Sequence, residues 1–190
     1  MFSPPADQPS CNQCVDPSDL RISATPVVRD GVLYGAWETG LDNGTQVVPG
    51  IEWARVDVSG TGVSARTDYY NFSGDASASY PALMPDGHGN VVMLFDRMSN
   101  TVFPETRFIV SAGGQFHGTG ALLKAGETNY RPQLCGSAAL PVCRWGDFSA
   151  ASFDGAGSIW FAGQYANQLN LGPPQNGRNW GTWIGAISAS

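Results

Sequence analysis

Apolar and polar residues alternate along this chain in short runs that glycine-rich turns separate. Four such runs lie between residues 22 and 72, and the third, at residues 51–58, alternates with a period of two. This period is typical of a β-strand with one solvent-exposed face. Asp30 and Gly31 separate the first two runs, and an Asp-Gly pair is a strong signal for a tight hairpin turn. We therefore expect four antiparallel strands in this segment.

The same order of runs and turns appears twice more. The later runs occupy residues 80–85, 91–95, 106–111, 120–125, 147–153, 158–165 and 180–187. Asp-Gly turns at residues 86–90 and 154–157 again follow the first run of each pass. The third pass has three runs where the first two have four. One repeated hairpin therefore accounts for most of the chain.

Units of roughly 55–65 residues with four strands each are typical of β-propeller blades. We predict an all-β fold with almost no helix and about three four-stranded antiparallel blades, at residues 22–75, 78–130 and 131–190. Residues 1–20 are proline-rich and are expected to form an extended lead-in, with the first strand beginning at Ile22. The alternative fold is a β-sandwich of the lectin kind.

Three blades form only part of a ring, because propellers have about four to eight. The remaining blades would come from more of the same polypeptide or from a second copy of the chain.

The composition supports many short strands and excludes several classes of partner. The chain has 24 Gly, 13 Pro and 11% aromatic residues, which does not fit a disordered chain. Its net charge of -6 argues against a nucleic-acid partner, since phosphate binding needs clustered Lys and Arg. No apolar run is long enough to span a membrane, and no signal peptide is visible at the start. No sequence motif predicts a cofactor.

Four cysteines bear on the compartment in which the protein folds. Cys11 and Cys14 form a single C-x-x-C, and Cys135 and Cys143 lie across a later loop. A zinc ribbon would need a second C-x-x-C, so we predict no metal site. A redox motif would need a strand before it and a helix after it, which this lead-in lacks. We predict two local disulfides, 11–14 and 135–143, and hence an extracellular or periplasmic location.

The run R-W-G-D-F-S-A at residues 144–150 resembles a segment of secreted bacterial propeller proteins, many of them labelled sialidase-like. Residues 180–184, 31–37 and 80–82 resemble other blade segments of the same group, so the likeness spans about residues 20–190. The resemblance implies a propeller of the sialidase superfamily and export from the cell. It does not imply sialidase activity, because much of that group has no assigned reaction.

The sialidase marker, S-x-D-x-G-x-x-W, is not matched in this chain. Residues 152–160 depart from it in spacing and lie between the first two strands of a unit, so we interpret them as an ordinary Asp-Gly hairpin. Sialidases also need three arginines that grip a carboxylate, because an Arg fork holds a carboxylate bidentately. Among the nine arginines only Arg131 and Arg144 begin a predicted blade. No catalytic set can therefore be assigned.

The candidate binding residues are Arg144, Trp145 and Asp147. On the innermost strand of the last blade they would face the central channel and hold a polar ligand. In the alternative, the Asp147 carboxylate caps backbone N–H groups where the strand begins, with Arg144 as its ion-pair partner.

Two functions remain open. The first is a non-catalytic extracellular propeller segment that binds a glycan or a protein at its central face. The second is part of a sialidase-like glycoside hydrolase whose catalytic residues lie mostly outside this chain.

Overall fold

The computed structural model describes residues 3–17, 19–132, 141–168 and 179–188, which form strands and no helix. Sheet I contains β3 (Val27–Arg29), β4 (Val32–Asp42), β5 (Val47–Asp57) and β6 (Ser64–Tyr70). Sheet II contains β7 (Ser77–Pro85), β8 (Val91–Ser99), β9 (Val102–Val110) and β10 (Ala121–Lys124). Sheet III contains β12 (Ala150–Phe153), β13 (Ser158–Ala166) and β14 (Trp180–Ser188). The hairpin sheet contains β1 (Ala6–Gln8), β2 (Cys11–Asp16) and β11 (Cys143–Arg144).

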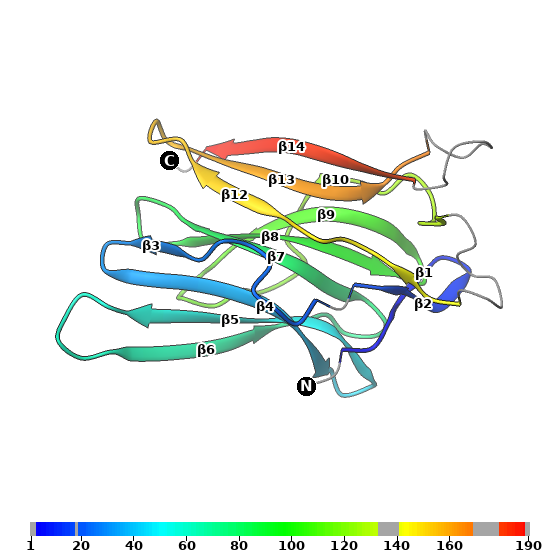
Figure 1. The fold of residues 1–190 in the computed structure, drawn as a ribbon, viewed down its shortest axis with the longest axis horizontal. Coiled ribbons are helices and arrows are strands. Elements are labelled where there is room, and N and C mark those ends of the chain that lie inside the picture. The colour runs from blue at the N-terminus through cyan, green and yellow to red at the C-terminus, as the bar shows by residue number, and fades with distance from the viewer. Residues whose placement is uncertain (1–2, 18, 133–140, 169–178, 189–190) are drawn as a thin grey trace.

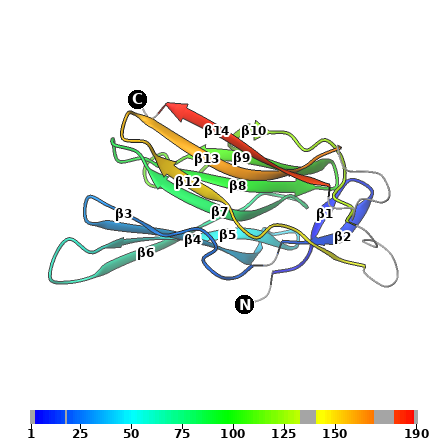
Figure 2. The ribbon, with the colours of Figure 1, turned by 45° about the horizontal axis from the view of Figure 1, so that its top comes forward.

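Sheets I, II and III lie in three layers, with sheet II in the middle and the hairpin sheet at one end (Figure 1). Figure 2 shows the same order after a turn of the view. Each layer is antiparallel and follows the chain order strand by strand. The predicted all-β fold with repeated three- and four-stranded antiparallel sheets is confirmed. The described residues form no closed ring, so the propeller arrangement stays a prediction, and they form three layers rather than the two of a lectin-like sandwich.

Strand β8 lies at the centre of the molecule and is apolar on both faces. Met93 and Phe95 pack into the core between sheets I and II, together with Ile51 and Trp53. Leu94, which points the other way, packs into the core between sheets II and III. Because successive side chains of a strand point to opposite faces, a strand covered on both sides needs an unbroken apolar run. The run at residues 91–95 therefore marks the sheet that both neighbours cover.

The Asp-Gly turns that join the first two strands of sheets II and III share one hydrogen-bond pattern. Asp86 Oδ1 accepts from the backbone N–H groups of His88 and Asn90 at 2.8 and 2.9 Å. Asp154 Oδ1 accepts in the same way from Ala156 and Ser158 at 2.7 and 3.1 Å. A carboxylate that binds N–H groups two and four residues ahead closes the turn locally. The local chemistry therefore explains why this hairpin recurs.

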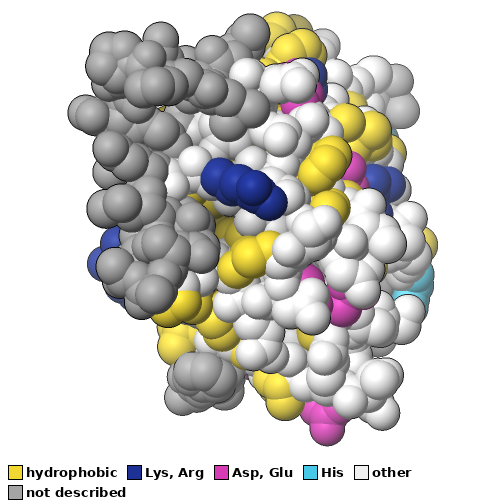
Figure 3. Space-filling model, turned by 90° about the vertical axis from the view of Figure 1, so that its right-hand side faces the viewer, with side chains coloured by type: hydrophobic (Ala, Val, Ile, Leu, Met, Phe, Trp, Pro, Cys, Tyr) yellow, Lys and Arg dark blue, Asp and Glu magenta, His cyan; other side chains and the backbone are white. Residues whose placement is uncertain are grey.

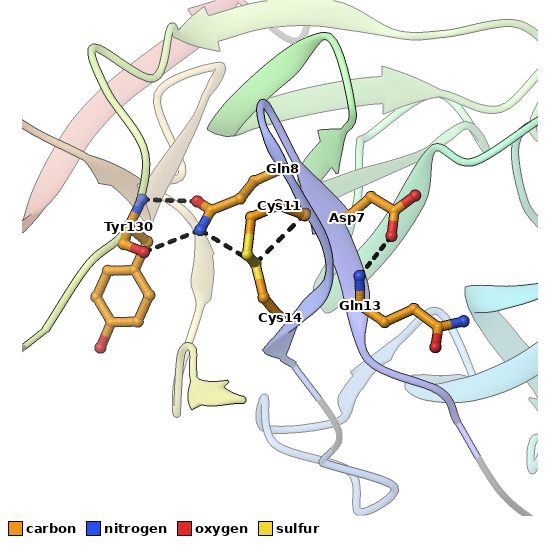
Figure 4. Close-up of a disulfide and its surroundings, with 6 residues drawn as sticks. All are labelled: Asp7, Gln8, Cys11, Gln13, Cys14 and Tyr130. Carbon is orange, nitrogen blue, oxygen red and sulfur yellow. Dashed lines mark hydrogen bonds between the residues drawn. A yellow bond between two sulfur atoms is a disulfide. The ribbon is translucent and has the colours of Figure 1, made fainter. Parts of the chain in front are cut away.

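Within the proline-rich segment expected as an extended lead-in up to residue 20, β1 and β2 form a hairpin. Ala6 pairs with Val15 and Gln8 with Cys11, and a bulge lies between them. The Gln8 side chain is buried and pairs with the backbone of Tyr130, donating to its oxygen at 3.0 Å and accepting from its nitrogen at 2.7 Å. Figure 4 shows this amide lying between Tyr130 and the sulfur of Cys14. The first strand of sheet I begins at Val27 and not at Ile22.

The predicted disulfide between Cys11 and Cys14 is present, with the two Cα atoms 5.9 Å apart. It spans the bulge of β2, where Gln13 has a φ of 48° and its N–H donates to Asp7 at 2.7 Å. Cys143 is also disulfide-bonded, and its predicted partner, Cys135, lies outside the described residues. Because this cross-link closes a loop of only a few residues, it restricts the hairpin locally.

Gly146 lies between the hairpin sheet and sheet III. The space around it shows how tightly this junction is packed. Its φ is 80°, and a Cβ there would lie 2.1 Å from the ring of Tyr80. Gly155 has nearly the same φ, 78°, with nothing within 4 Å of its would-be Cβ. We expect Gly155→Ala to lower the free energy of unfolding by about 1–2 kcal/mol through φ alone. Gly146→Ala should cost about 1–3 kcal/mol more, because the ring of Tyr80 must move.

Urea unfolding of the two variants measures this difference. Equal losses for Gly146→Ala and Gly155→Ala would contradict the close packing of Gly146 on Tyr80.

Candidate functional site

Arg144 and Asp147 lie at the surface and form an ion pair. Their side chains are 64% and 55% exposed. Arg144 belongs to β11, which pairs in parallel with β2, and the N–H of Trp145 donates to the oxygen of Asp16 at 2.8 Å. The prediction that Arg144 and Asp147 lie on the innermost strand of sheet III is wrong, because both precede β12. Arg144 belongs to the hairpin sheet instead, and Asp147 is joined to it by the ion pair.

Trp145, the third candidate, is directed into the protein and is 1% exposed. Its indole N–H donates to Asp96 Oδ2 at 2.9 Å, and its ring meets that of Tyr130 edge-on at 4.9 Å. A buried Trp usually satisfies its N–H in this way. The structure therefore brings Arg144 and Asp147 together and places Trp145 beneath them as packing.

An open groove of about 980 Å³ lies beside the Arg144–Asp147 pair. The residues that line it are Tyr130, Pro132, Cys143, Arg144, Gly146, Asp147, Phe148, Ser149, Ala150, Ala162, Gly163, Gln164, Trp180 and Thr182. Among the described residues of this lining, Arg144 and Asp147 are the only charged ones, and their charges are opposite. Phe148 is 76% exposed and Trp180 is 40% exposed. The described lining thus offers aromatic surface, amide and hydroxyl groups, and one pair of opposite charges.

A second ion pair lies close to the first. Arg21 donates to both carboxylate oxygens of Asp19, at 2.7 Å each, and this contact holds the pKa of Asp19 below its usual range. Arg144 and Asp147 are near enough to act electrostatically on Asp19 and Arg21 respectively. Figure 3 views the end of the molecule at which β1 and β2 lie, and charged side chains are few on its described surface. The four charges of Asp19, Arg21, Arg144 and Asp147 are therefore paired with one another.

Tyr80 and Glu38 lie beneath this surface. Tyr80 is 2% exposed and has a φ of 48°, a backbone conformation that residues other than glycine rarely adopt. Burial raises the pKa of its phenol, and the neighbouring Glu38 raises it further. Burial likewise raises the pKa of Glu38 well above its usual value, although the Ser3 hydroxyl donates to it at 2.9 Å. A phenol activated for attack needs a lowered pKa and an ionised base, so this pair is not arranged for nucleophilic catalysis.

Asp96 is fully buried between sheets II and III. Burial raises the pKa of its carboxyl to about 8, although the indole N–H of Trp145 partly offsets this. Ser79 and Thr106 are its cross-strand neighbours on β7 and β9. A protonated carboxyl at neutral pH keeps this junction free of buried charge.

Sequence reasoning did not identify Asp96, Glu38 or Tyr80. One signal was available, since Asp96 directly follows the apolar run of residues 91–95 and alternation places it on a buried face. A carboxyl at such a position requires a hydrogen-bond partner from another element. No local pattern indicates that the partner is Trp145.

Within the described ranges, no three His, Cys, Asp or Glu side chains are placed to hold a metal ion. The same ranges contain no helix long and apolar enough to cross a membrane. No protein-family model, curated protein or solved structure matches this chain. The chain therefore has no family assignment, and its likeness to sialidase-like propellers rests on the residues quoted above.

The raised pKa of Asp96 predicts how stability depends on pH. An unfolded Asp ionises near pH 4, whereas Asp96 in the folded protein ionises near pH 8. Between these values the unfolded state loses its proton and the folded state keeps it, so this group lowers the free energy of unfolding progressively as the pH rises. Asp96→Asn removes the effect and retains an oxygen that can accept from Trp145. We expect the Tm of Asp96→Asn to rise relative to the Tm of the wild type as the pH increases from 5 to 9.

Thermal unfolding at a series of pH values measures this shift. A difference in Tm that stays constant from pH 5 to pH 9 would show that Asp96 is not protonated in the folded state. Gly155→Ala, which removes no titratable group, is the control and should show no such trend.

Proposed function

We propose that this chain is a non-catalytic, extracytoplasmic segment of a β-propeller that binds a glycan in the groove beside Arg144 and Asp147. The observation that carries the proposal is the exposed, mutually neutralising pair Arg144–Asp147 next to the exposed rings of Phe148 and Trp180. Flat apolar rings beside paired donors and acceptors suit a sugar, which presents both C–H faces and hydroxyl groups.

The charge of the groove favours a neutral glycan. Arg144 and Asp147 are each other's partner, so neither supplies an unpaired charge for a carboxylate or a cation. Gln164 and Thr182 add amide and hydroxyl groups to the lining. Such groups give orientation through hydrogen bonds, while the aromatic rings contribute contact area.

The disulfide between Cys11 and Cys14 supports an extracytoplasmic location, because disulfides persist in oxidising compartments. The bonded state of Cys143 supports it as well.

The alternative function is part of a sialidase-like glycoside hydrolase. The observation in its favour is the proximity of Tyr80 and Glu38 beneath two arginines, Arg21 and Arg144, since a Tyr–Glu pair near arginines is what that chemistry uses. The raised pKa values of Tyr80 and Glu38 argue against it. Turnover of a fluorogenic sialoside by the purified chain, lost in Tyr80→Phe, would support the alternative and overturn the non-catalytic proposal.

Removal of the ion pair tests the binding proposal. We expect Asp147→Ala to weaken binding to a neutral glycan selected on a glycan array by at least about tenfold, because a charge-assisted hydrogen bond is lost. Its stability should change by less than about 1 kcal/mol, because an exposed ion pair contributes little. Titration calorimetry and thermal unfolding measure the two effects. Arg66→Ala, on exposed β6 of sheet I, is the matched control and should bind normally.

Binding unaffected by Asp147→Ala would place the ligand elsewhere, and loss of folding would show that the pair is structural. A protein ligand is the other possible occupant of the groove. Binding to a purified protein, with no signal on the array, would replace the glycan in this proposal.

A further inference from the structure

A row of three buried polar side chains crosses sheet II on the face that sheet III covers. Asp96 on β8 pairs with Ser79 on β7 and with Thr106 on β9, so the three side chains lie side by side. Each of the three residues is 0% exposed. Ser79 Oγ, Asp96 Oδ1 and Thr106 Oγ1 have no hydrogen-bond partner among the described residues, although the other Asp96 oxygen accepts from Trp145. Folding has therefore removed these polar atoms from water without giving them a new contact.

The row lies beneath the groove. Burial raises the pKa of the Asp96 carboxyl, and the Gln164 side chain lies close enough to oppose that rise. A Cβ added at Gly163 would overlap Thr106 Oγ1, so the backbone of β13 rests directly on the row. Gly163 and Gln164 also line the groove. The backbone of β13 thus separates the row from the groove.

Two residues of the groove lining, Ser149 and Gln164, add buried polar atoms of their own, and we refer to them as the groove floor. Ser149 is 6% exposed and Gln164 is 8% exposed, and Ser149 Oγ and Gln164 Nε2 also lack a hydrogen-bond partner. The described part of the chain has nine such atoms, and five of them belong to the row and the floor. A buried polar atom without a partner destabilises the fold. A cluster of five therefore points to a partner that the chain itself does not supply.

The chemistry of the groove floor suits a neutral group that both donates and accepts hydrogen bonds. Gln164 Nε2 donates, and the Ser149 hydroxyl donates or accepts. Neither residue carries a charge, so an ionic group would lose its hydration there without gaining a counter-charge. The oxygen of an alcohol can accept from Gln164 and donate its proton to Ser149 at the same time.

The depth of the floor favours an alcohol that projects from a sugar ring. Ser149 Oγ and Gln164 Nε2 are both buried, so a ligand group must extend beyond the open surface to reach them. The hydroxymethyl group of a hexose extends one carbon further than a hydroxyl on the ring. Ala150 and Ala162, which pair beside the floor, have small side chains that leave room for it.

We propose that the groove floor is a subsite for the hydroxymethyl group of a neutral hexose. The sugar ring lies against Trp180, which is 40% exposed, and the hydroxymethyl oxygen bonds to Gln164 and Ser149. Hexoses are then bound in preference to pentoses and 6-deoxyhexoses, which lack this hydroxyl. The inference rests on the proposed glycan binding and adds the specificity of that same groove.

Binding to paired neutral oligosaccharides tests the subsite. The probes are hexose oligomers beside their pentose and 6-deoxy counterparts, such as β-1,4-linked glucose beside β-1,4-linked xylose. We expect the hexose oligomers to bind at least about tenfold more tightly, because two hydrogen bonds depend on the hydroxymethyl group. Gln164→Met should remove most of this preference. The control is Gln115→Met, at an exposed position in the loop between β9 and β10, which should retain it.

The two proposals fail in different ways. Equal binding of hexose and pentose oligomers would overturn the subsite and leave glycan binding in the groove intact. Absence of binding to every neutral oligosaccharide would overturn both.

Thermal unfolding tests the groove floor without any glycan. Met has a similar length to Gln but no amide, so Gln164→Met removes the unpartnered Nε2 atom. We expect its Tm to rise by about 2–4 °C, and the Tm of Gln115→Met to stay unchanged. An unchanged or lower Tm for Gln164→Met would show that the amide is already satisfied in the folded protein, for example by a bound water. That result would overturn the subsite.

Discussion

The hydrogen bond between the Trp145 indole and Asp96 is the contact on which the positions of the surrounding parts depend. It joins the centre of sheet II to the segment that leads into sheet III. The same tryptophan packs edge-on against Tyr130, whose backbone is paired with Gln8 of the hairpin sheet. One side chain therefore connects three sheets. Both partners of the Trp145 side chain are buried. Removing this side chain would therefore leave Asp96 without the indole donor in an apolar junction.

This junction also determines which chemistry is available at the surface. Asp96, Glu38 and Tyr80 are acidic groups, but burial favours the protonated form of each. Asp96 accepts from Trp145, and the ring of Tyr80 lies against Gly146, so these two groups support residues 145 and 146 from below. The side chains left exposed there are Arg144, Asp147 and Phe148. Burial thus separates the acidic groups beneath residues 144–148 from the charged and aromatic side chains exposed above them.

The strands and turns could be predicted from the sequence because their signals are local. The two-residue period of residues 51–58 and the Asp-Gly turns at Asp86 and Asp154 depend on neighbours within a few positions. The hairpin of residues 6–16 could not be predicted, because its stability comes from a disulfide and from contacts with Tyr130 and β11. The burial of Trp145 was missed for the same reason. Its sequence neighbours Arg144 and Asp147 are exposed, and only a partner on another sheet explains its position.

The pairing of Gln8 with Tyr130 joins residues 122 positions apart. Sheets I and II are built from strands adjacent in the sequence, so they close short loops and can form early. The hairpin of β1 and β2 is synthesised before either sheet, yet Tyr130 and β11 reach it only after both are complete. During synthesis on the ribosome, Gln8 therefore lacks its native partner until Tyr130 has been made. The segment nearest the start of the described chain is therefore among the last to reach its native contacts, and in the meantime its disulfide restricts only the conformations of the hairpin itself.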